Sequence, residues 1–185
     1  MALYLALFRG INVSGKNIIK MESLRKQMEL TGYTNVQTYI QSGNVVFETK
    51  QTSKAEISVA IESLIKKEYG YDITVFVLDM ADMNKVAVDS PYATREELEE
   101  GSKKLYVTFL SQVPQKENIQ KLYDAPIGDD LIELKDDILY FKLASKASDS
   151  KLSNNLIESK LKLKATTRNW NTTIKLLAML EKSKK

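Results

Sequence analysis

The amino-acid sequence predicts an α+β protein made of two ferredoxin-like (α/β-plait) subdomains in tandem, each with the element order β-α-β-β-α-β. Three observations predict this fold. The chain has 185 residues, of which 43% are hydrophobic, enough for one medium core or two small ones. Short β-rich runs alternate with helical repeats, and the same order recurs in the second half. In each half, two β-rich runs flank a polar turn, which is typical of a hairpin.

The first half opens with a strand, a helix and a hairpin. In residues 2–9 both alternating sets of side chains are apolar, as expected of a strand covered on both faces. A helical repeat from Met21 to Met28 then stops at Gly32, a candidate helix C-cap. Two β-rich runs flank the Ser-Gly-Asn turn at 42–44, which predicts a hairpin.

A capped helix and a strand complete the first subdomain. Ser53 and Glu56 have the spacing of a capping box, and an amphipathic stripe of isoleucine and leucine follows them. Residues 72–78 form the last strand, so the first subdomain spans 1–78. A connecting segment at 79–103 is helical in its first part and acidic and exposed at its end.

The second subdomain, residues 104–185, repeats this order less regularly. A strand at 105–110 precedes a short helix at 115–123, and the next two strands turn at Asp136-Asp137. The remaining elements are a helix over 150–161, a brief extended stretch near 164–166 and a last helix over 172–181. The two halves share this order of elements and no visible sequence.

Cysteine and histidine are both absent. Without cysteine there are no disulfides and no thiolate chemistry, which fits a cytoplasmic protein. Without either residue we expect no metal site and no cofactor, and catalysis would depend on Asp, Glu, Lys, Tyr, Ser or Thr. Arg9 interrupts the short N-terminal apolar run, so we expect a strand there and not a signal peptide, and no run approaches the roughly 18 apolar residues of a membrane span.

The net charge of +3 is unevenly distributed along the chain. Residues 1–78 carry 9 basic and 7 acidic side chains (+2), residues 79–145 carry 8 and 14 (−6), and residues 146–185 carry 10 and 3 (+7). The C-terminal segment is therefore the part that faces an anion, or it is a solvated basic surface.

The stretch GINVSGKN at 10–17 has the glycine and lysine spacing of a phosphate-binding P-loop. Asn17 occupies the position of the hydroxyl that ligates magnesium, no helix begins before Met21, and the next strands form a hairpin, so we exclude a P-loop. The loop still offers donors from Arg9, Asn12, Lys16, Asn17 and Lys20. Alternatively, its glycines only shape a turn and its lysines are solvated.

The stretch TTRNWN, which ends at Asn171, contains the best candidate site. Arg168, Asn169, Trp170 and Asn171 directly precede a predicted helix start at Thr172, where backbone N–H groups and the helix dipole favour an anion. Arg168 can hold a phosphate or carboxylate with two hydrogen bonds, and Trp170 can stack on a ring. Alternatively, Asn171 or Thr172 caps the helix. We favour the anion site for Arg168 and a packing role for Trp170.

A third polar stretch, IQSGN, adds donors from Gln41, Ser42 and Asn44 around the hairpin turn, although turn chemistry alone explains Gly43 and Asn44. All three stretches are rich in Arg, Lys, Asn, Gln and Thr, and none contains a carboxylate. Such a set recognises anions or amides and offers no general base.

The stretches ALFRGINVSGKN, TYIQSGNVVF and ATTRNWNTTIKLLAML resemble the three signature blocks of the bacterial domain-of-unknown-function family numbered 1697. The resemblance spans nearly the whole chain. It implies two ferredoxin-like subdomains and no established biochemical function. Members commonly carry a Gly-Arg-Ser-Lys-Leu-like stretch before the penultimate helix. This chain has ASDSKL there, which keeps Lys151 and lacks the glycine and the arginine.

These observations predict a binding module that holds a phosphate-bearing ligand, a nucleotide or RNA, in a cleft between the subdomains. We expect Lys16, Arg168 and the helix start at Thr172 to converge on one anion. The full set of expected ligand-binding residues is Arg9, Asn12, Lys16, Asn17, Gln41, Ser42, Asn44, Lys151, Arg168, Asn169, Asn171 and Thr172. The alternatives are an enzyme acting on a phosphorylated metabolite or nucleotide, and a protein-interaction module.

Overall fold

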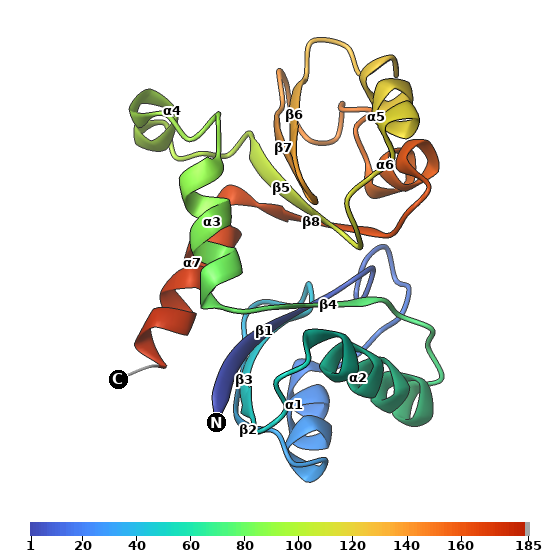
Figure 1. Ribbon diagram of the computed structural model, residues 1–185, viewed down its shortest axis with the longest axis vertical. Helices are drawn as coiled ribbons and strands as arrows, with labels where there is room; N and C mark the ends of the chain where they lie inside the picture. Colours follow the sequence, from blue (N-terminus) through green and yellow to red (C-terminus); the bar gives the residue numbers. More distant parts are fainter. Residues whose placement is uncertain (184–185) are drawn as a thin grey trace. The chain divides into compact units, whose positions relative to one another are not determined.

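The computed structural model describes residues 1–183, which contain both helices and strands (Figure 1). Their bounds in chain order are β1 (Ala2–Phe8), α1 (Met21–Leu30), β2 (Thr34–Thr38), β3 (Asn44–Thr49), α2 (Lys54–Tyr69), β4 (Val75–Leu78), α3 (Met80–Asp89), α4 (Arg95–Glu99), β5 (Leu105–Leu110), α5 (Lys116–Tyr123), β6 (Leu131–Lys135), β7 (Ile138–Lys142), α6 (Asn154–Leu161), β8 (Ala165–Asn169) and α7 (Trp170–Lys182). None of these helices is both long enough and apolar enough to cross a membrane.

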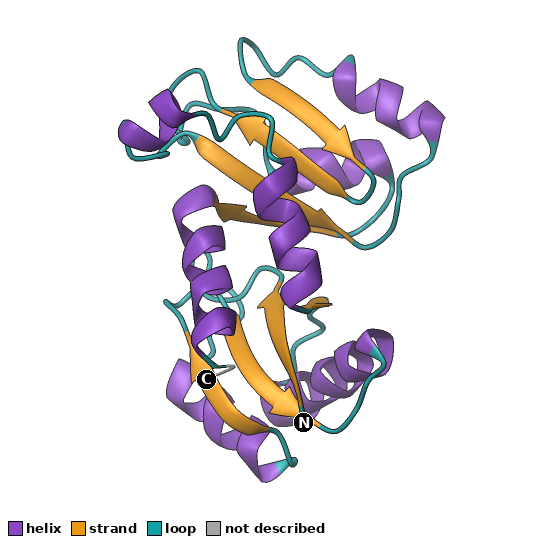
Figure 2. Cartoon of the chain, turned by 60° about the vertical axis from the view of Figure 1, so that its left-hand side comes forward, coloured by secondary structure: helices purple, strands orange, loops and turns teal. Residues whose placement is uncertain are grey.

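The strands form two four-stranded sheets of the same topology. The strand orders are β2-β3-β1-β4 and β6-β7-β5-β8, and every pairing is antiparallel. Figure 2 shows the strands of each sheet side by side. Each sheet therefore has the β-α-β-β-α-β order and the strand arrangement of a ferredoxin-like unit, which confirms the predicted fold class. Antiparallel pairing throughout is also incompatible with the parallel sheet of a P-loop fold.

The chain divides into two compact units, which we call the first and the second unit. The first unit contains Met1–Asn84 and the chain from Lys175 onward, and the second unit contains Lys85–Ile174. The boundaries thus fall inside α3 and α7.

The core of the first unit lies between its sheet and the helices α1 and α2 (Figure 1). Its buried side chains include Tyr4, Ala6 and Phe8 of β1, Leu24 and Met28 of α1, and Ile57 and Ile61 of α2. Ser53 caps α2 as predicted, since its Oγ accepts a hydrogen bond from the Glu56 backbone N–H at 3.3 Å, which is one of the two bonds of a capping box. Gly70 ends α2 in the left-handed conformation.

The core of the second unit lies between its sheet and the helices α5 and α6. It contains Leu122, Leu139, Phe141, Ile157 and Leu161. Tyr106 stacks on Phe141 with ring centroids 5.0 Å apart and planes 6° apart. On the other face of this sheet, Tyr140 is buried and donates a hydrogen bond to the Val86 carbonyl at 3.1 Å. Burial raises the pKa of the Tyr140 hydroxyl above its usual value.

The second unit differs from the sequence prediction at three element boundaries. The extended stretch expected near 164–166 continues to Asn169, because threonines sustain its pairing with β5: the Thr108 and Thr167 hydroxyls lie 2.8 Å apart. The last helix consequently begins at Trp170 and not at Thr172. The helix expected over 150–161 begins at Asn154, because Ser153 caps it by accepting from the Leu156 N–H at 3.2 Å.

Candidate functional site

The polar loop after β1 forms a tight hairpin tip. The Lys16 N–H donates to the Val13 carbonyl at 2.9 Å, and Ser14 and Gly15 between them have φ values of 49° and 73°. Two central residues with positive φ are the signature of a type I′ turn. The glycine and lysine that suggested P-loop spacing therefore shape a turn, as the alternative interpretation proposed, and Lys16 is exposed at its end.

The amide of Asn12 joins this loop to the hairpin turn between β2 and β3. Its Nδ2 donates to the carbonyls of Ile19 at 2.9 Å and Gln41 at 2.8 Å, and its Oδ1 accepts from the Ile19 N–H at 2.9 Å. Asn17 Nδ2 donates to the Gly10 carbonyl at 3.0 Å. Both amides thus stabilise the loop itself, and the structure brings Asn12, Asn17 and Gln41 together.

The turn between β2 and β3 is ordered in the same way. Asn44 is fully buried, and its Nδ2 donates to the Tyr39 carbonyl at 2.9 Å and to Ser42 Oγ at 3.0 Å. Gly43 has φ +78°, and its carbonyl accepts from the Phe8 N–H at 2.9 Å. A Cβ at this position would lie 2.7 Å from Phe8 Cβ. Only glycine therefore allows the two loops to pack so closely.

The junction of β8 and α7 uses its polar side chains internally. Arg168 is 7% exposed, and its Nη1 donates to Thr166 Oγ1 and to the Thr167 carbonyl, both at 2.9 Å. Burial lowers the pKa of its guanidinium to about 10. Arg168 therefore belongs to a strand on a buried sheet face and does not lie in the open polar segment that the sequence predicted. Lys16 lies in the first unit and Arg168 in the second, so their convergence on one anion stays a prediction.

Asn169 and Asn171 fix the start of α7. Asn169 Oδ1 accepts from the Asn171 N–H at 2.9 Å, which satisfies one of the free donors of the first helical turn. Asn171 Nδ2 donates to the Gly101 carbonyl at 2.8 Å. Thr172 is partly exposed in this turn. The cap is therefore Asn169, which precedes both residues that the sequence suggested, Asn171 and Thr172.

Lys151 lies in an acidic environment. It lines a pocket of about 330 Å³ with Asp129, Asp130 and Asp149. Asp130 is buried and accepts hydrogen bonds from the Ala144 N–H at 2.8 Å and from the hydroxyl of Ser150. Three carboxylates around one lysine disfavour a phosphate, so this pocket does not suit the predicted ligand.

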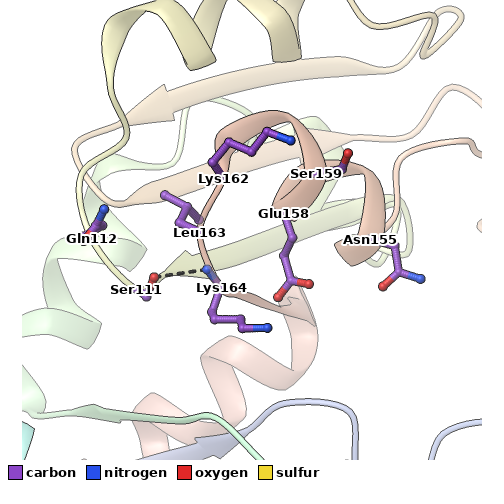
Figure 3. A pocket seen from close by; sticks show the side chains of 8 residues that line it. All are labelled: Ser111, Gln112, Asn155, Glu158, Ser159, Lys162, Leu163 and Lys164. Carbon is purple, nitrogen blue, oxygen red and sulfur yellow. Dashed lines mark hydrogen bonds between the residues drawn. The ribbon is translucent and has the colours of Figure 1, made fainter.

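A larger pocket in the second unit has the opposite character. Its volume is about 620 Å³, and we call it the basic pocket. Figure 3 shows its lining residues, which are Ser111, Gln112, Asn155, Glu158, Ser159, Lys162, Leu163 and Lys164. They come from the loop after β5, from α6 and from the turn between α6 and β8.

Backbone hydrogen bonds hold two sides of the basic pocket together. The Ser111 N–H donates to the Lys164 carbonyl at 2.9 Å, and the Lys164 N–H donates to Ser111 Oγ at 3.1 Å (Figure 3). These bonds extend the β5–β8 ladder by one pair beyond Leu110 and Ala165. The hydroxyl of Ser111 accepts one bond here, and its own hydrogen remains available to a ligand oxygen.

The end of α6 positions the lysines. Lys162 is the C-cap in the left-handed conformation, with φ 58°, and its N–H donates to the Glu158 carbonyl at 2.8 Å. Glu158 Oε1 accepts from the Ala165 N–H at 2.9 Å, so this carboxylate anchors the start of β8. In Figure 3 the Lys162 ammonium lies above the α6–β8 turn, and the side chains of Glu158 and Lys164 lie below it.

The two lysines of the basic pocket lack acidic partners. Lys162 and Lys164 are exposed, and within residues 1–183 neither forms an ion pair. Gln112, Asn155 and Ser159 are exposed beside them and add neutral donors and acceptors. The pocket therefore presents two cations and several polar groups to one volume.

This pocket was not among the sites predicted from the sequence. Its signal is the alternation Lys160-Leu161-Lys162-Leu163-Lys164, which turns leucines toward the core and lysines toward solvent, inside the segment of charge +7. The predicted sites were continuous polar stretches, whereas in this stretch every second residue is apolar.

Comparisons with known proteins identify a family and a fold. A family model described as "Protein of unknown function (DUF1697)" matches residues 1–140. The solved structure of a conserved bacterial protein, SP0830 from Streptococcus pneumoniae, is similar to this chain with a TM-score of 0.73 and 23% sequence identity, over 96% of this chain and 98% of that one. At this identity the likeness concerns the fold alone. A search of curated proteins gave no match.

Proposed function

The chain belongs to the DUF1697 family of proteins of unknown function, and from that premise we propose that it is a binding module for a phosphate-bearing ligand, held in the basic pocket of the second unit. The ligand class is a nucleotide or RNA. A single observation carries this proposal: Lys162 and Lys164 line one pocket, and within residues 1–183 neither is neutralised by an ion pair.

Two unpaired lysines around one volume favour an anion. Hydrogen bonds between an ammonium group and a phosphate oxygen are charge-assisted and about twice as strong as neutral ones. Lys162 and Lys164 both add to the positive potential at the pocket, which attracts an anion. Glu158 lowers the positive potential, but its carboxylate already accepts the Ala165 N–H.

The neutral groups favour the sugar-phosphate part of the ligand. The lining contains hydroxyls from Ser111 and Ser159 and amides from Gln112 and Asn155, which suit ribose hydroxyls and phosphate oxygens. Its residues include no aromatic ring on which a base could stack. A volume of about 620 Å³ lies within the usual range for small-ligand pockets, about 300–1,000 Å³. We therefore expect recognition of the backbone and little preference among bases.

A titration followed by NMR tests the proposal. Uniformly ¹⁵N-labelled protein is titrated with adenosine monophosphate and, separately, with a 12-nucleotide poly(U) RNA. The backbone amide signals of Gln112, Ser159, Lys162 and Lys164 should shift, while those of Asp129 and Lys151 around the acidic pocket should not. Shifts confined to other surfaces, or no shifts with either probe at low salt, would contradict the proposal.

A further inference from the structure

The two interlocked loops of the first unit expose a group of aliphatic side chains. Val13 and Ile18 in the loop after β1 are 55% and 54% exposed, and Ile40 in the turn between β2 and β3 is 49% exposed. Large aliphatic side chains at such exposure are common singly, but a group of them marks an interaction surface. Whether these three form a group depends on how the loops pack.

The hydrogen bonds of Asn12 bring the backbone positions of these three residues close together. Asn12 binds the backbone of Ile19 and of Gln41 at 2.8–2.9 Å. Val13 follows Asn12 in the chain, Ile18 precedes Ile19, and Ile40 precedes Gln41. Each exposed side chain is therefore one residue from the same hydrogen-bonded centre, and the surface is held by the fold.

Ile40 adopts a conformation that isoleucine rarely takes. Its φ is +49°, in the left-handed region that is unfavourable for β-branched residues by about 1–2 kcal/mol. The side chain is half-exposed, so burial within the chain only partly offsets this cost. Strain of this kind persists mainly at positions that serve binding or catalysis. A glycine or asparagine would suit the backbone better, which indicates that the aliphatic side chain itself has a use.

The charge of the loops identifies the kind of partner. Lys16 and Lys20 are exposed, and residues 9–21 and 39–47 contain no aspartate and no glutamate. Residues 9–20 and 39–43 contain one aromatic residue, Tyr39, which is partly buried. Aliphatic side chains offer no ring for base stacking, so they favour a protein over RNA.

We propose that Val13, Ile18, Ile40, Lys16 and Lys20, together the loop surface, dock an acidic segment of a partner protein that also carries aliphatic side chains. The aliphatic side chains bury against Val13, Ile18 and Ile40, and the partner's carboxylates pair with the two lysines. This surface lies in the first unit and the basic pocket in the second, so the inference does not rest on the proposed function.

A peptide selection tests the inference on the full chain. A library of random 12-residue peptides is selected on immobilised wild-type protein, and the enriched sequences are synthesised for fluorescence polarisation. Enrichment of peptides that combine Asp or Glu with Leu, Ile or Val is the expected result. Enrichment of no acidic-aliphatic sequence would overturn the inference, whatever happens at the basic pocket.

Variants locate the binding of the enriched peptide. Lys16→Glu and Ile40→Gly should each weaken it at least about tenfold. Ile40→Gly should leave the melting temperature unchanged or raise it, because glycine accepts the positive φ. Lys50→Glu and Val59→Ser change matched exposed positions of the first unit and should alter affinity less than about twofold.

Two outcomes of these variants count against the loop surface. Equal binding of the peptide by wild type, Lys16→Glu and Ile40→Gly would place the peptide elsewhere. Loss of poly(U) RNA binding in the two loop variants, with peptide binding unchanged, would show that the loops contact nucleic acid. Either result overturns the inference.

Discussion

Gly43, in the turn between β2 and β3, packs tightly against Phe8 of β1 and Ile11 of the following loop. An added Cβ would lie 2.6 Å from Ile11 Cδ1 and 2.7 Å from Phe8 Cβ, at a positive φ. Phe8 Cβ is attached to the backbone of β1 and cannot rotate away. We expect Gly43→Ala to lower the free energy of unfolding by about 2–4 kcal/mol, since steric overlap adds to backbone strain. Chemical denaturation measures the loss.

Gly15→Ala is the matched control for Gly43→Ala. Gly15 has a similar φ of +73°, but no atom lies within 4 Å of its added Cβ. Only backbone strain remains, so the cost should be about 1 kcal/mol. Equal losses of unfolding free energy for the two variants would show that steric overlap does not restrict which residue fits at position 43.

A substitution at Arg168 distinguishes a structural role of this residue from an anion-binding role. Its burial and its bonds to Thr166 and Thr167 predict that Arg168→Lys lowers the melting temperature, because lysine cannot reproduce the planar set of donors. A thermal melt measures this change. A variant that keeps its melting temperature but loses affinity for adenosine monophosphate would instead support the anion site predicted from the sequence.

The residue types in the sequence indicated which side chains form hydrogen bonds, but not which groups they bond to. Asn12, Asn44 and Asn169 were expected to face a ligand, and each bonds to the backbone of its own unit. An amide that binds a ligand and one that closes a turn have the same local signal, since both favour Asn beside Gly. Some partners are local, such as Tyr39 for Asn44 and Asn171 for Asn169. Others, Gln41 for Asn12 and Leu105 for Asn169, are distant in the chain, and only the fold brings them together.

At the scale of elements, Lys54 links the starts of α2 and α3. Its Nζ lies 2.7 Å from Asp79 and 2.5 Å from Asp82. Burial alone raises the pKa of Asp79, but hydrogen bonds from Lys54 Nζ and from the N–H groups of Asp82 and Ala81 outweigh it and lower the pKa below 3.8. The ionised carboxylate is thus favoured in the folded state.

This lowered pKa predicts an acid-dependent loss of stability. Because the folded-state pKa of Asp79 lies below the unfolded one, its stabilisation is complete above the unfolded value and disappears as the pH falls through the folded value. Lys54→Met should reduce the fall in melting temperature between pH 5 and pH 2.5. Lys66→Met, which removes an exposed pair with Asp72, is the control. Parallel acid profiles for Lys54→Met and wild type would exclude this contribution.

The order of elements followed from the sequence except for the short helix α4, where the acidic end of the connecting segment was expected to be exposed and Glu97 is buried, and three boundaries also differed. Apolar periodicity located β1, β5 and α2, because their buried faces are continuous. β8 contains Thr166, Thr167 and Arg168, and it is a strand because β5 pairs with it. Such a polar strand has no periodic signal, so the sequence placed its residues in a loop before a helix.

At the scale of the whole molecule, the ligand's size determines how binding depends on salt. RNA that contacts several lysines releases counterions, so its affinity should fall steeply and linearly on a log-log plot of salt concentration. In the proposed site, adenosine monophosphate would contact only Lys162 and Lys164 among the lysines, so its affinity should depend weakly on salt. Titrations at 50 and 200 mM salt distinguish the two. A weak dependence of poly(U) affinity on salt concentration would indicate that the RNA contacts only the lysines of the basic pocket.

The basic pocket could not be predicted because it joins distant parts of the chain. Ser111 and Gln112 follow β5, and Asn155 to Lys164 come from α6 and the turn after it. The β5–β8 pairing brings them together, and that pairing depends on the polar strand that the sequence did not reveal. The fold class, by contrast, rests on local periodicity and on short hairpins, which the sequence contains directly.

The most direct test of the proposed function compares two charge-matched double variants. Binding of 5′-fluorescein-labelled poly(U) 12-mer and of fluorescent adenosine monophosphate is measured by polarisation for Lys162→Ala/Lys164→Ala and for Lys116→Ala/Lys146→Ala, whose lysines are exposed outside the pocket. The pocket variant should lose at least about tenfold in affinity for both probes, and the control less than about threefold. Equal affinities of the two variants, or undetectable binding of either probe by the wild type at low salt, would contradict a phosphate site in the basic pocket.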